Sequence, residues 1–329
     1  MRLTTPVEIP TNLPEITHRH TVLLVGSCFA THMGERMRAA KLHCTINPHG
    51  VLYNPLSIAT ALNELVEGKT YTPDDLYPHD GLWHSPMHHG SFSTPDIDHT
   101  LRLINESLRT GREALLKADH LLLTFGTAWV YIDHTTGHVV GNCHKLPAQR
   151  FERRRLGVDE ITTCIAYLFT RLFALRPSLR VLLTVSPVRH LRDGLHANQL
   201  SKATLLLAVD ELCTRFPGQV FYFPAYELLT DELRDYRFYA DDLTHPSTQA
   251  IDYVWEHFAQ AMFSPETRAL SDECIAIGRT LAHRPLHPDT LAYHRLLTDT
   301  IAKIERMQAQ YPFLDFQNEL DKCHTALTK

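Results

Sequence analysis

The chain has 329 residues, of which 44% are hydrophobic, and this is enough to build one large α/β domain with an additional unit. Its formal net charge of -5 argues against a nucleic-acid partner, and no apolar run reaches the roughly 18 residues that a membrane span requires. Residues 1–20 lack the apolar core of a signal peptide, and the seven cysteines form no C-x-x-C pair. We therefore expect a cytoplasmic protein with reduced thiols and no membrane partner.

The first predicted strand is the short, apolar and β-branched run at residues 21–25, which Gly26 ends. Helical spacing begins at Ala30, so Ser27 and Cys28 occupy the strand-to-helix turn, where α/β proteins place their ligands. Free backbone N–H groups and the positive end of a helix favour an anion, a thiolate or a developing oxyanion there. The alternative is structural, with Ser27 as the helix cap and Cys28 packed inward.

Four further strands are predicted in chain order, at residues 44–46, 120–125, 180–185 and 220–223. Predicted helices alternate with them, at residues 56–66, 101–118, 159–175, 198–216 and 247–263. This βαβ alternation predicts a mostly parallel five-stranded sheet with helices on both faces. Its ligand site is expected at the carboxyl ends of the strands.

Three segments fall outside this alternation. Residues 129–145 alternate apolar and polar side chains around a Thr-Gly turn, which predicts an inserted β-hairpin. Residues 70–100 are rich in Pro, Asp, Ser and His, which predicts a long loop that could cover the site. The basic string "ERRR" at residues 152–155 is typical of a solvated face.

Beyond residue 263 the pattern is purely helical. Ser264 and Pro265 form an N-cap and N1 pair, and Pro285, Pro288 and Pro312 separate the later helices. We therefore expect an α/β domain over residues 1–263 and a C-terminal helical extension over residues 264–329. The extension could mediate formation of a homo-oligomer.

A candidate catalytic pair precedes the last helix of the α/β part. Asp242 and His245 have the spacing D-x-x-H, which lets one turn present both side chains. In a catalytic triad the histidine accepts the proton of the nucleophile, while the carboxylate fixes the imidazole tautomer and stabilises its charged form. A Ser or Cys at the first strand-to-helix turn, followed later by D-x-x-H, is the layout of the SGNH (GDSL-type) hydrolases.

Several strings follow one another in order along residues 20–262. They are "GSCFA" at 26–30, "NPHGVLYNP" at 47–55, "TFGTAWVY" at 124–131, "NCHKLP" at 142–147, "TVSPVRH" at 184–190, "NQLSKA" at 198–203 and "ELRDYRFYADDLTHPS" at 232–247. Together they resemble the GSCFA-domain family. The resemblance implies a three-layer α/β/α, flavodoxin-like fold of the SGNH-hydrolase type.

The resemblance also implies which side chain acts as nucleophile. Laid over the SGNH pattern, Cys28 takes the place of the nucleophilic serine, and Ser27 takes the place of the preceding aspartate. The helix N-terminus and His245 would both favour the thiolate of Cys28. A turn shifted by one residue would instead make Ser27 the nucleophile.

An oxyanion hole belongs to the same pattern. The N–H of Cys28 and that of Gly50 are the expected backbone donors, whereas Ala128 stands where SGNH hydrolases have an asparagine. Loss of such a donor costs about 3 to 4 kcal/mol of transition-state stabilisation elsewhere. Asn142 or His144, on the return arm of the predicted hairpin, is expected to replace it.

Two further groups of side chains are candidates for the site. Arg189 and His190 end the fourth strand and should face its mouth, where they contact the substrate or pair with a helix. The loop histidines His84, His88 and His89 could instead ligate a metal ion, since imidazole is the commonest zinc ligand.

The leading interpretation is a hydrolase or acyltransferase that acts on an ester of an O-acetyl or other short acyl group. A Cys/Ser-His-Asp triad would form an acyl-enzyme, and no cofactor is expected. A small-molecule or carbohydrate ester is the expected substrate, by fold analogy. Two alternatives stay open, namely a noncatalytic ligand-binding module on the same fold and a metal-dependent hydrolase that uses the histidine loop.

Overall fold

The computed structural model describes residues 4–283, 286 and 290–328. Within these residues, five parallel strands form a central sheet in the order β2-β1-β5-β8-β9. Their bounds are β1 (Thr21–Gly26), β2 (His43–Ile46), β5 (His120–Phe125), β8 (Arg180–Val185) and β9 (Val220–Tyr222). Each end lies within one residue of its prediction, so the predicted parallel sheet is confirmed.

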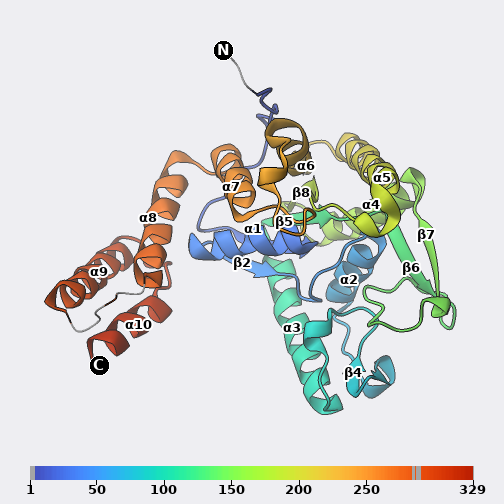
Figure 1. Ribbon diagram of the computed structural model, residues 1–329, viewed down its shortest axis with the longest axis horizontal. Helices are drawn as coiled ribbons and strands as arrows, with labels where there is room; N and C mark the ends of the chain where they lie inside the picture. Colours follow the sequence, from blue (N-terminus) through green and yellow to red (C-terminus); the bar gives the residue numbers. More distant parts are fainter. Residues whose placement is uncertain (1–3, 284–285, 287–289, 329) are drawn as a thin grey trace.

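Helices cover both faces of this sheet (Figure 1). Because successive side chains of a strand point to opposite faces, Leu23 and Val25 join one apolar cluster, and Val22 and Leu24 join another. The first cluster packs the sheet against α2 to α5, and the second packs it against α1 and α7. These helices are α1 (Cys28–Ala39), α2 (Pro55–Glu67), α3 (Ile97–Lys117), α4 (Val158–Leu175), α5 (Gly194–Arg215) and α7 (Thr248–Met262). The expected three-layer α/β/α fold is therefore confirmed.

The turn from β1 into α1 depends on Gly26. Its φ is 149°, and a Cβ atom built there would lie 2.3 Å from Thr124 O on β5, so a side chain would collide with the neighbouring strand. Asn47 Oδ1 accepts the Gly26 N–H at 2.8 Å. The end of β1 is thus held against both adjacent strands, which places the next two residues at the edge of the sheet.

The predicted hairpin around the Thr-Gly turn is short, and β6 (Trp129–Asp133) forms its longer ladder with another strand. β6 pairs antiparallel with β7 (Phe151–Arg155), whereas residues 138–145 leave the ladder after an isolated bridge. An ion pair joins the end of β6 to the residue before β7, since Arg150 Nη2 lies 2.7 Å from the Asp133 carboxylate. The string at residues 152–155, predicted as a solvated face, belongs to this strand. Glu152 and Arg155 are exposed, as predicted, whereas Arg153 and Arg154 are partly buried.

The segment at residues 70–100 is packed against the domain and is not a free cover. It contains the antiparallel pair β3 (Tyr77–His79) and β4 (Leu82–His84) and the beginning of α3. His84 and His88 are buried within it.

Short helical turns join other elements, namely 3₁₀ turns at Pro73–Asp75, Gly90–Phe92, Ala148–Arg150, Leu191–Asp193 and Tyr236–Phe238, a π turn at Leu228–Leu233, and α6 (Ala225–Glu227).

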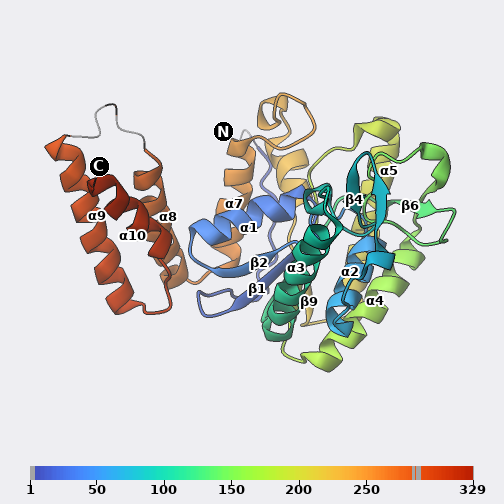
Figure 2. The same ribbon diagram turned by 90° about the horizontal axis from the view of Figure 1, so that it is seen from below.

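The C-terminal helices α8 (Pro265–Ala282), α9 (Leu291–Gln310) and α10 (Gln317–Leu327) stand beside the sheet layers (Figure 2). They share an apolar cluster of their own, and Lys41 Nζ binds Glu319 Oε2 at 2.7 Å to join them to the α/β part. Pro312 lies between α9 and α10, while Pro285 and Pro288 lie outside the described residues. The domain boundary at residues 263/264 and the oligomeric role of this unit stay predictions. No helix in the described ranges has the length and apolar character that a bilayer span needs.

Candidate active site

Ser27 and Cys28 have different environments at the carboxyl end of β1. Ser27 is buried, and its Oγ accepts the Phe29 N–H at 3.3 Å as the N-cap of α1. Cys28 is the first helical residue and is only partly buried. Ser27 therefore satisfies an otherwise unpaired N–H of the first turn, and the Cys28 thiol stands at the positive end of the helix.

Tyr53 contacts Cys28 directly. Its hydroxyl oxygen lies 3.8 Å from Cys28 Sγ. Its backbone carbonyl accepts the N–H groups of Gly126 and Thr127 at 2.7 and 3.0 Å, which ties Tyr53 to the end of β5. Burial raises the pKa of the Tyr53 phenol, and the neighbouring Cys28 raises it further. The phenol therefore keeps its proton at neutral pH and can donate it in a hydrogen bond.

Asp242 and His245 meet in the turn before α7. His245 Nδ1 lies 2.6 Å from Asp242 Oδ2, and Asp242 Oδ1 accepts the backbone N–H groups of Thr244 and His245, both at 2.9 Å. The His245 N–H, the His245 ring and the Thr244 N–H together lower the pKa of Asp242 well below its usual range. The carboxylate is thus ionised and orients Nδ1, which leaves Nε2 for another partner.

A cavity of about 550 Å³ opens beside these groups. Its lining includes Tyr53, Asn142, Arg189, His190 and His245. Tyr53, His190 and His245 follow different strands of the central sheet, whereas Asn142 follows the inserted strand β6. Convergence at the carboxyl end of the sheet is the arrangement expected for a ligand site in an open α/β fold. Tyr53 therefore connects the cavity to the Cys28 thiol.

Among the described residues, no hydrogen bond joins His245 to Cys28 or Ser27. Burial is the largest cause that lowers the pKa of His32, and the charge of His245 also lowers it. Since His32 follows Cys28 by four residues on α1, both lie on one face of the helix. His245 therefore lies within electrostatic reach of the face that carries Cys28.

The sequence profile of the GSCFA family matches residues 21–258, which is most of the chain. This chain belongs to the GSCFA family. A second profile, described as the C-terminal domain of GSCFA domain proteins, matches residues 276–329. No curated protein sequence matches the chain.

Solved structures that resemble this GSCFA chain do so distantly. A family 3 carbohydrate esterase from Talaromyces cellulolyticus is 9% identical at a TM-score of 0.35, over 77% of this chain and 98% of its own. A family 3 carbohydrate esterase from Clostridium thermocellum is 14% identical at a TM-score of 0.33, with the same coverage. An acetyl xylan esterase from the rumen bacterium Butyrivibrio proteoclasticus is 10% identical at a TM-score of 0.38, over 74% of this chain and 63% of its own.

The GSCFA string "NQLSKA" on α5 forms hydrogen bonds with the loops that border the site. Lys202 is fully buried, and its Nζ donates to Gly126 O and Ser186 O, both at 2.6 Å. Burial lowers the pKa of this amine to about 7. Asn198 Oδ1 accepts the His190 N–H at 2.9 Å. The string therefore ties together the loops that follow β5 and β8.

Two of the expected oxyanion donors have other partners in this GSCFA chain. The Gly50 N–H donates to Asn47 O at 2.7 Å across a tight turn, so it is not free for a substrate. His144 is buried away from the cavity, with Nε2 2.8 Å from Ser85 O. Asn142 lines the cavity, and its Oδ1 accepts the His144 N–H. Of these three residues, Asn142 alone stays a candidate donor.

Arg189 and His190 both line the cavity, as the sequence predicted for the mouth of the site. Arg189 donates its N–H to Thr244 O at 3.0 Å, which holds the turn that carries His245. No carboxylate pairs with Arg189 in the part of the chain that the structure describes. The ring of His190 meets Tyr53 edge-on, and its Nε2 is buried without a hydrogen-bond partner among the described residues.

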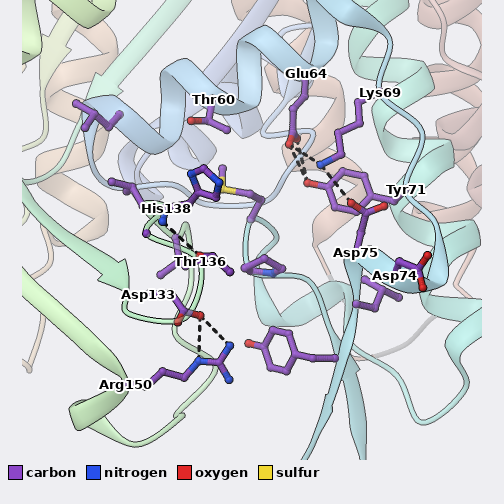
Figure 3. Close-up of a pocket in the computed structure, with 18 of the residues that line it drawn as sticks. Thr60, Glu64, Lys69, Tyr71, Asp74, Asp75, Asp133, Thr136, His138 and Arg150 are labelled. Atoms are coloured by element: carbon purple, nitrogen blue, oxygen red, sulfur yellow. Dashed lines mark hydrogen bonds and ion pairs between the residues drawn. The ribbon is translucent and has the colours of Figure 1, made fainter.

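A second cavity, of about 680 Å³, shares Val140 with the first, because this residue lines both. All of its charged side chains except Asp74 take part in ion pairs with one another, within the described residues (Figure 3). Lys69 Nζ lies 3.1 Å from Glu64 Oε1, and the Tyr71 hydroxyl donates to the same oxygen at 3.0 Å. Glu64 in turn receives His49 Nε2 at 2.8 Å. This cavity is therefore bordered by a satisfied polar cluster.

The loop histidines have separate partners and do not converge as metal ligands. His84 Nδ1 lies 2.7 Å from Ser93 Oγ, and His88 Nδ1 lies 2.8 Å from Ser85 Oγ. His89 lines the cavity beside Tyr53 instead. Within the described ranges, no three His, Cys, Asp or Glu side chains are grouped closely enough to hold a metal ion. The geometry therefore does not support the metal-dependent alternative.

Buried histidines predict a steep loss of stability in acid. Burial lowers the pKa of His120, His144 and His190 to about 4 and that of His88 well below its usual value. In the unfolded chain these side chains bind protons below pH of about 6.5, so the free energy of unfolding should fall between about pH 6.5 and 4. The slope is up to about 1.4 kcal/mol per pH unit for each histidine. Urea unfolding at several pH values measures it, and an unchanged slope in the His144→Gln variant would contradict the assignment for that residue.

Proposed function

We propose that this GSCFA-family chain is an esterase-type hydrolase that removes a short acyl group from an ester. The observation that carries this proposal is the position of the Cys28 thiol. It stands at the N-terminus of α1 against Tyr53, which lines the same cavity as His245, and His245 is bonded to Asp242. A carbohydrate ester is the expected substrate by fold analogy alone.

In the proposed mechanism, His245 Nε2 takes the proton of the Cys28 thiol, and the thiolate attacks the ester carbonyl carbon. Asp242 orients the imidazole and stabilises its charged form. The tetrahedral intermediate collapses to a thioester on Cys28, and His245 gives its proton to the departing alcohol. His245 then takes a proton from water, which attacks the thioester carbonyl. The C–S bond breaks, the acid leaves, and His245 returns the proton to the Cys28 thiolate. A hydroxyl acceptor in place of water would make the same site an acyltransferase.

We further propose that Tyr53 supplies the oxyanion donor that the missing asparagine would have provided. The Gly126, Thr127 and Ala128 N–H groups already donate to Tyr53 O or Ser201 Oγ, so the loop after β5 has none of these to offer. The Tyr53 hydroxyl is protonated and lies next to the thiol. Together with the Cys28 N–H at the helix start, it can receive the negative charge that develops on the carbonyl oxygen.

The Tyr53→Phe substitution tests this donor. Removing one donor from an oxyanion hole lowers kcat by about 10² to 10³-fold, and KM should change little because the charge develops only in the transition state. Steady-state kinetics with 4-nitrophenyl acetate measures both constants. Asn142→Ala is the matched variant, and a larger loss of kcat there than in Tyr53→Phe would transfer the role to Asn142.

The function itself is tested by turnover of 4-nitrophenyl acetate and butyrate, combined with mass spectrometry of the quenched enzyme. We expect release of 4-nitrophenol, an acyl adduct on the peptide that contains Cys28, and full activity after dialysis against a chelator. Binding of ester without turnover or adduct would favour the noncatalytic module. Loss of activity on chelation, with recovery on adding metal, would favour the metal-dependent hydrolase.

A further inference from the structure

The cavity beside Cys28 carries an excess of positive charge in a chain whose formal net charge is -5. Its Lys, Arg, Asp and Glu lining consists of Arg153, Arg189, Arg192 and Asp193. Arg153 Nη2 binds Asp193 Oδ2 at 2.7 Å, so this pair is internally neutral. Arg189 and Arg192 form no ion pair within the described residues, and they leave about two positive charges uncompensated.

Aromatic rings hold these guanidinium groups in place. Arg189 Cζ lies 5.3 Å from the ring centre of Tyr239, and Arg192 Cζ lies 5.6 Å from that of Tyr131. Arg153 Cζ lies 4.5 Å from the Trp129 ring. A guanidinium over a ring face is attracted to it, and its N–H edge stays available to an acceptor. The rings therefore position the three side chains. Arg153 also binds Asp193, and Arg189 Nη1 donates to Leu243 O at 3.5 Å, while the other guanidinium N–H groups of Arg189 and those of Arg192 have no partner within the described residues.

In the neighbouring cavity, by contrast, the basic side chains are paired with carboxylates. There Lys69 faces both Glu64 and Asp75, and Arg150 binds Asp133 through two N–H groups (Figure 3). Both cavities thus hold basic side chains, but the second supplies a carboxylate for each basic group named here. The absence of a carboxylate partner for Arg189 and Arg192 within the described residues therefore distinguishes the cavity beside Cys28 from its neighbour.

The same lining holds an unsatisfied donor. Trp129 lines the cavity, and its indole Nε1 is buried with no hydrogen-bond partner among the described residues. A buried polar group without a partner is rare in native proteins, and a bound ligand is one of the ways in which it becomes satisfied. The free guanidinium groups of Arg189 and Arg192 therefore give the cavity N–H donors and positive charge, which is the complement of a ligand rich in acceptor oxygens.

We propose that the natural substrate is an anionic ester whose carboxylate or phosphate group binds Arg192 and Arg189 while its acyl carbonyl lies at Cys28. This inference rests on the proposed function, because it names the substrate class of the same site. A planar guanidinium matches the two oxygens of a carboxylate or phosphate, so both anions share one recognition chemistry. Arg192 is exposed, so its charge can also attract the ester before binding.

A matched set of acetyl esters tests the proposal. The substrates are methyl 4-acetoxybenzoate, which is neutral, 4-acetoxybenzoate, which carries a carboxylate, and 4-acetoxyphenyl phosphate. For each protein the measured quantity is kcat/KM of an anionic ester divided by that of the neutral ester. Arg192→Gln is expected to lower this ratio about tenfold or more, and Arg189→Gln should also lower it, since each removes a charge-assisted hydrogen bond. Raising the salt from about 0.02 M to about 0.5 M should lower the wild-type ratio.

Arg295→Gln is the matched control, because Arg295 is an exposed arginine on α9, outside the cavity, and its loss should leave the ratio unchanged. The carboxylate and phosphate esters then show which anion the cavity prefers. A ratio that stays within about twofold in both cavity variants and does not respond to salt overturns the inference, while hydrolysis of the neutral ester would still support the esterase.

A binding measurement separates this inference from catalysis. Calorimetry with benzoate and with phenyl phosphate should show binding to the wild-type chain and to Arg295→Gln, with affinity weakened about tenfold or more in Arg192→Gln. Absence of turnover for every ester would defeat the proposed function, and binding lost only in the Arg192 variant would still support an anion site. Equal binding by all three proteins would overturn it.

Discussion

Replacement of Cys28 by alanine is expected to lower kcat for 4-nitrophenyl acetate by at least about 10³-fold, the scale seen when a nucleophile is removed from a catalytic triad. The physical reason is that Cys28 presents its thiol at the start of α1, whereas the neighbouring Ser27 hydroxyl is buried and already accepts the Phe29 N–H. Steady-state kinetics of the purified variant measures the loss, with circular dichroism to establish that it is folded.

Ser27→Ala is the matched substitution on the adjacent residue. It removes the helix cap, which costs about 1 kcal/mol of stability, and it should leave the enzyme partly active. If Ser27→Ala loses all activity while Cys28→Ala keeps it, the nucleophile is Ser27. The turn is then shifted by one residue relative to the SGNH pattern.

Alkylation provides an independent measurement on the unmodified chain. Burial raises the pKa of the other cysteine thiols, so they stay protonated and react slowly near neutral pH; these are Cys44, Cys143, Cys164, Cys213, Cys274 and Cys323. Iodoacetamide should therefore modify Cys28 first, and activity should fall in step with that modification. Faster labelling of another cysteine, with activity retained, would argue against the assignment.

His245→Ala is expected to lower kcat by about 10³-fold or more, and Asp242→Asn should lower it less. The difference follows from their roles, because His245 accepts the proton itself, whereas Asp242 holds Nδ1 at 2.6 Å and fixes the ring orientation. The measurement is kcat over a range of pH, with the rate of acyl-adduct formation on Cys28 as a second readout.

His99→Ala is the control for this pair, since His99 is an exposed histidine on α3 and should be dispensable. Because His245 and Cys28 are not hydrogen-bonded in this structure, the proposed mechanism requires the imidazole to come nearer to the thiol during the reaction. Undiminished turnover by His245→Ala would remove the histidine from the mechanism. A loss in Asp242→Asn that exceeds the loss in His245→Ala would show that the carboxylate acts directly.

The sequence by itself determined the features that depend on short stretches of chain. The parallel strands β1, β5 and β8 are continuous apolar runs, because both faces of each are buried, and they appear within one residue of their predicted ends. Asp242 and His245 meet because three residues of one turn separate them. These features are local, so residue type and spacing are sufficient to predict them.

Only the tertiary structure decided which distant segments meet. β6 forms its long ladder with β7 and meets residues 138–145 only at the Ile132–Val139 bridge, and the Asp133–Arg150 ion pair joins the end of β6 to the residue before β7. His144 Nε2 is paired with Ser85 O and does not line the cavity, so it is not available there as an oxyanion donor. Arg153, which the composition of "ERRR" had placed on a solvated face, comes to lie over Trp129 in the cavity.

The contact of Tyr53 with Cys28 is another feature that the sequence could not predict. Tyr53 belongs to the string that follows β2, so its position at the edge of the sheet could have been inferred, but its contact with Cys28 Sγ depends on how two loops pack together. Its carbonyl occupies the Gly126 and Thr127 N–H groups, and this pairing is likewise absent from any local pattern. Hydrogen-bond donors pair with acceptors that are far away in the sequence. The tertiary structure therefore decides which donors stay free for a substrate.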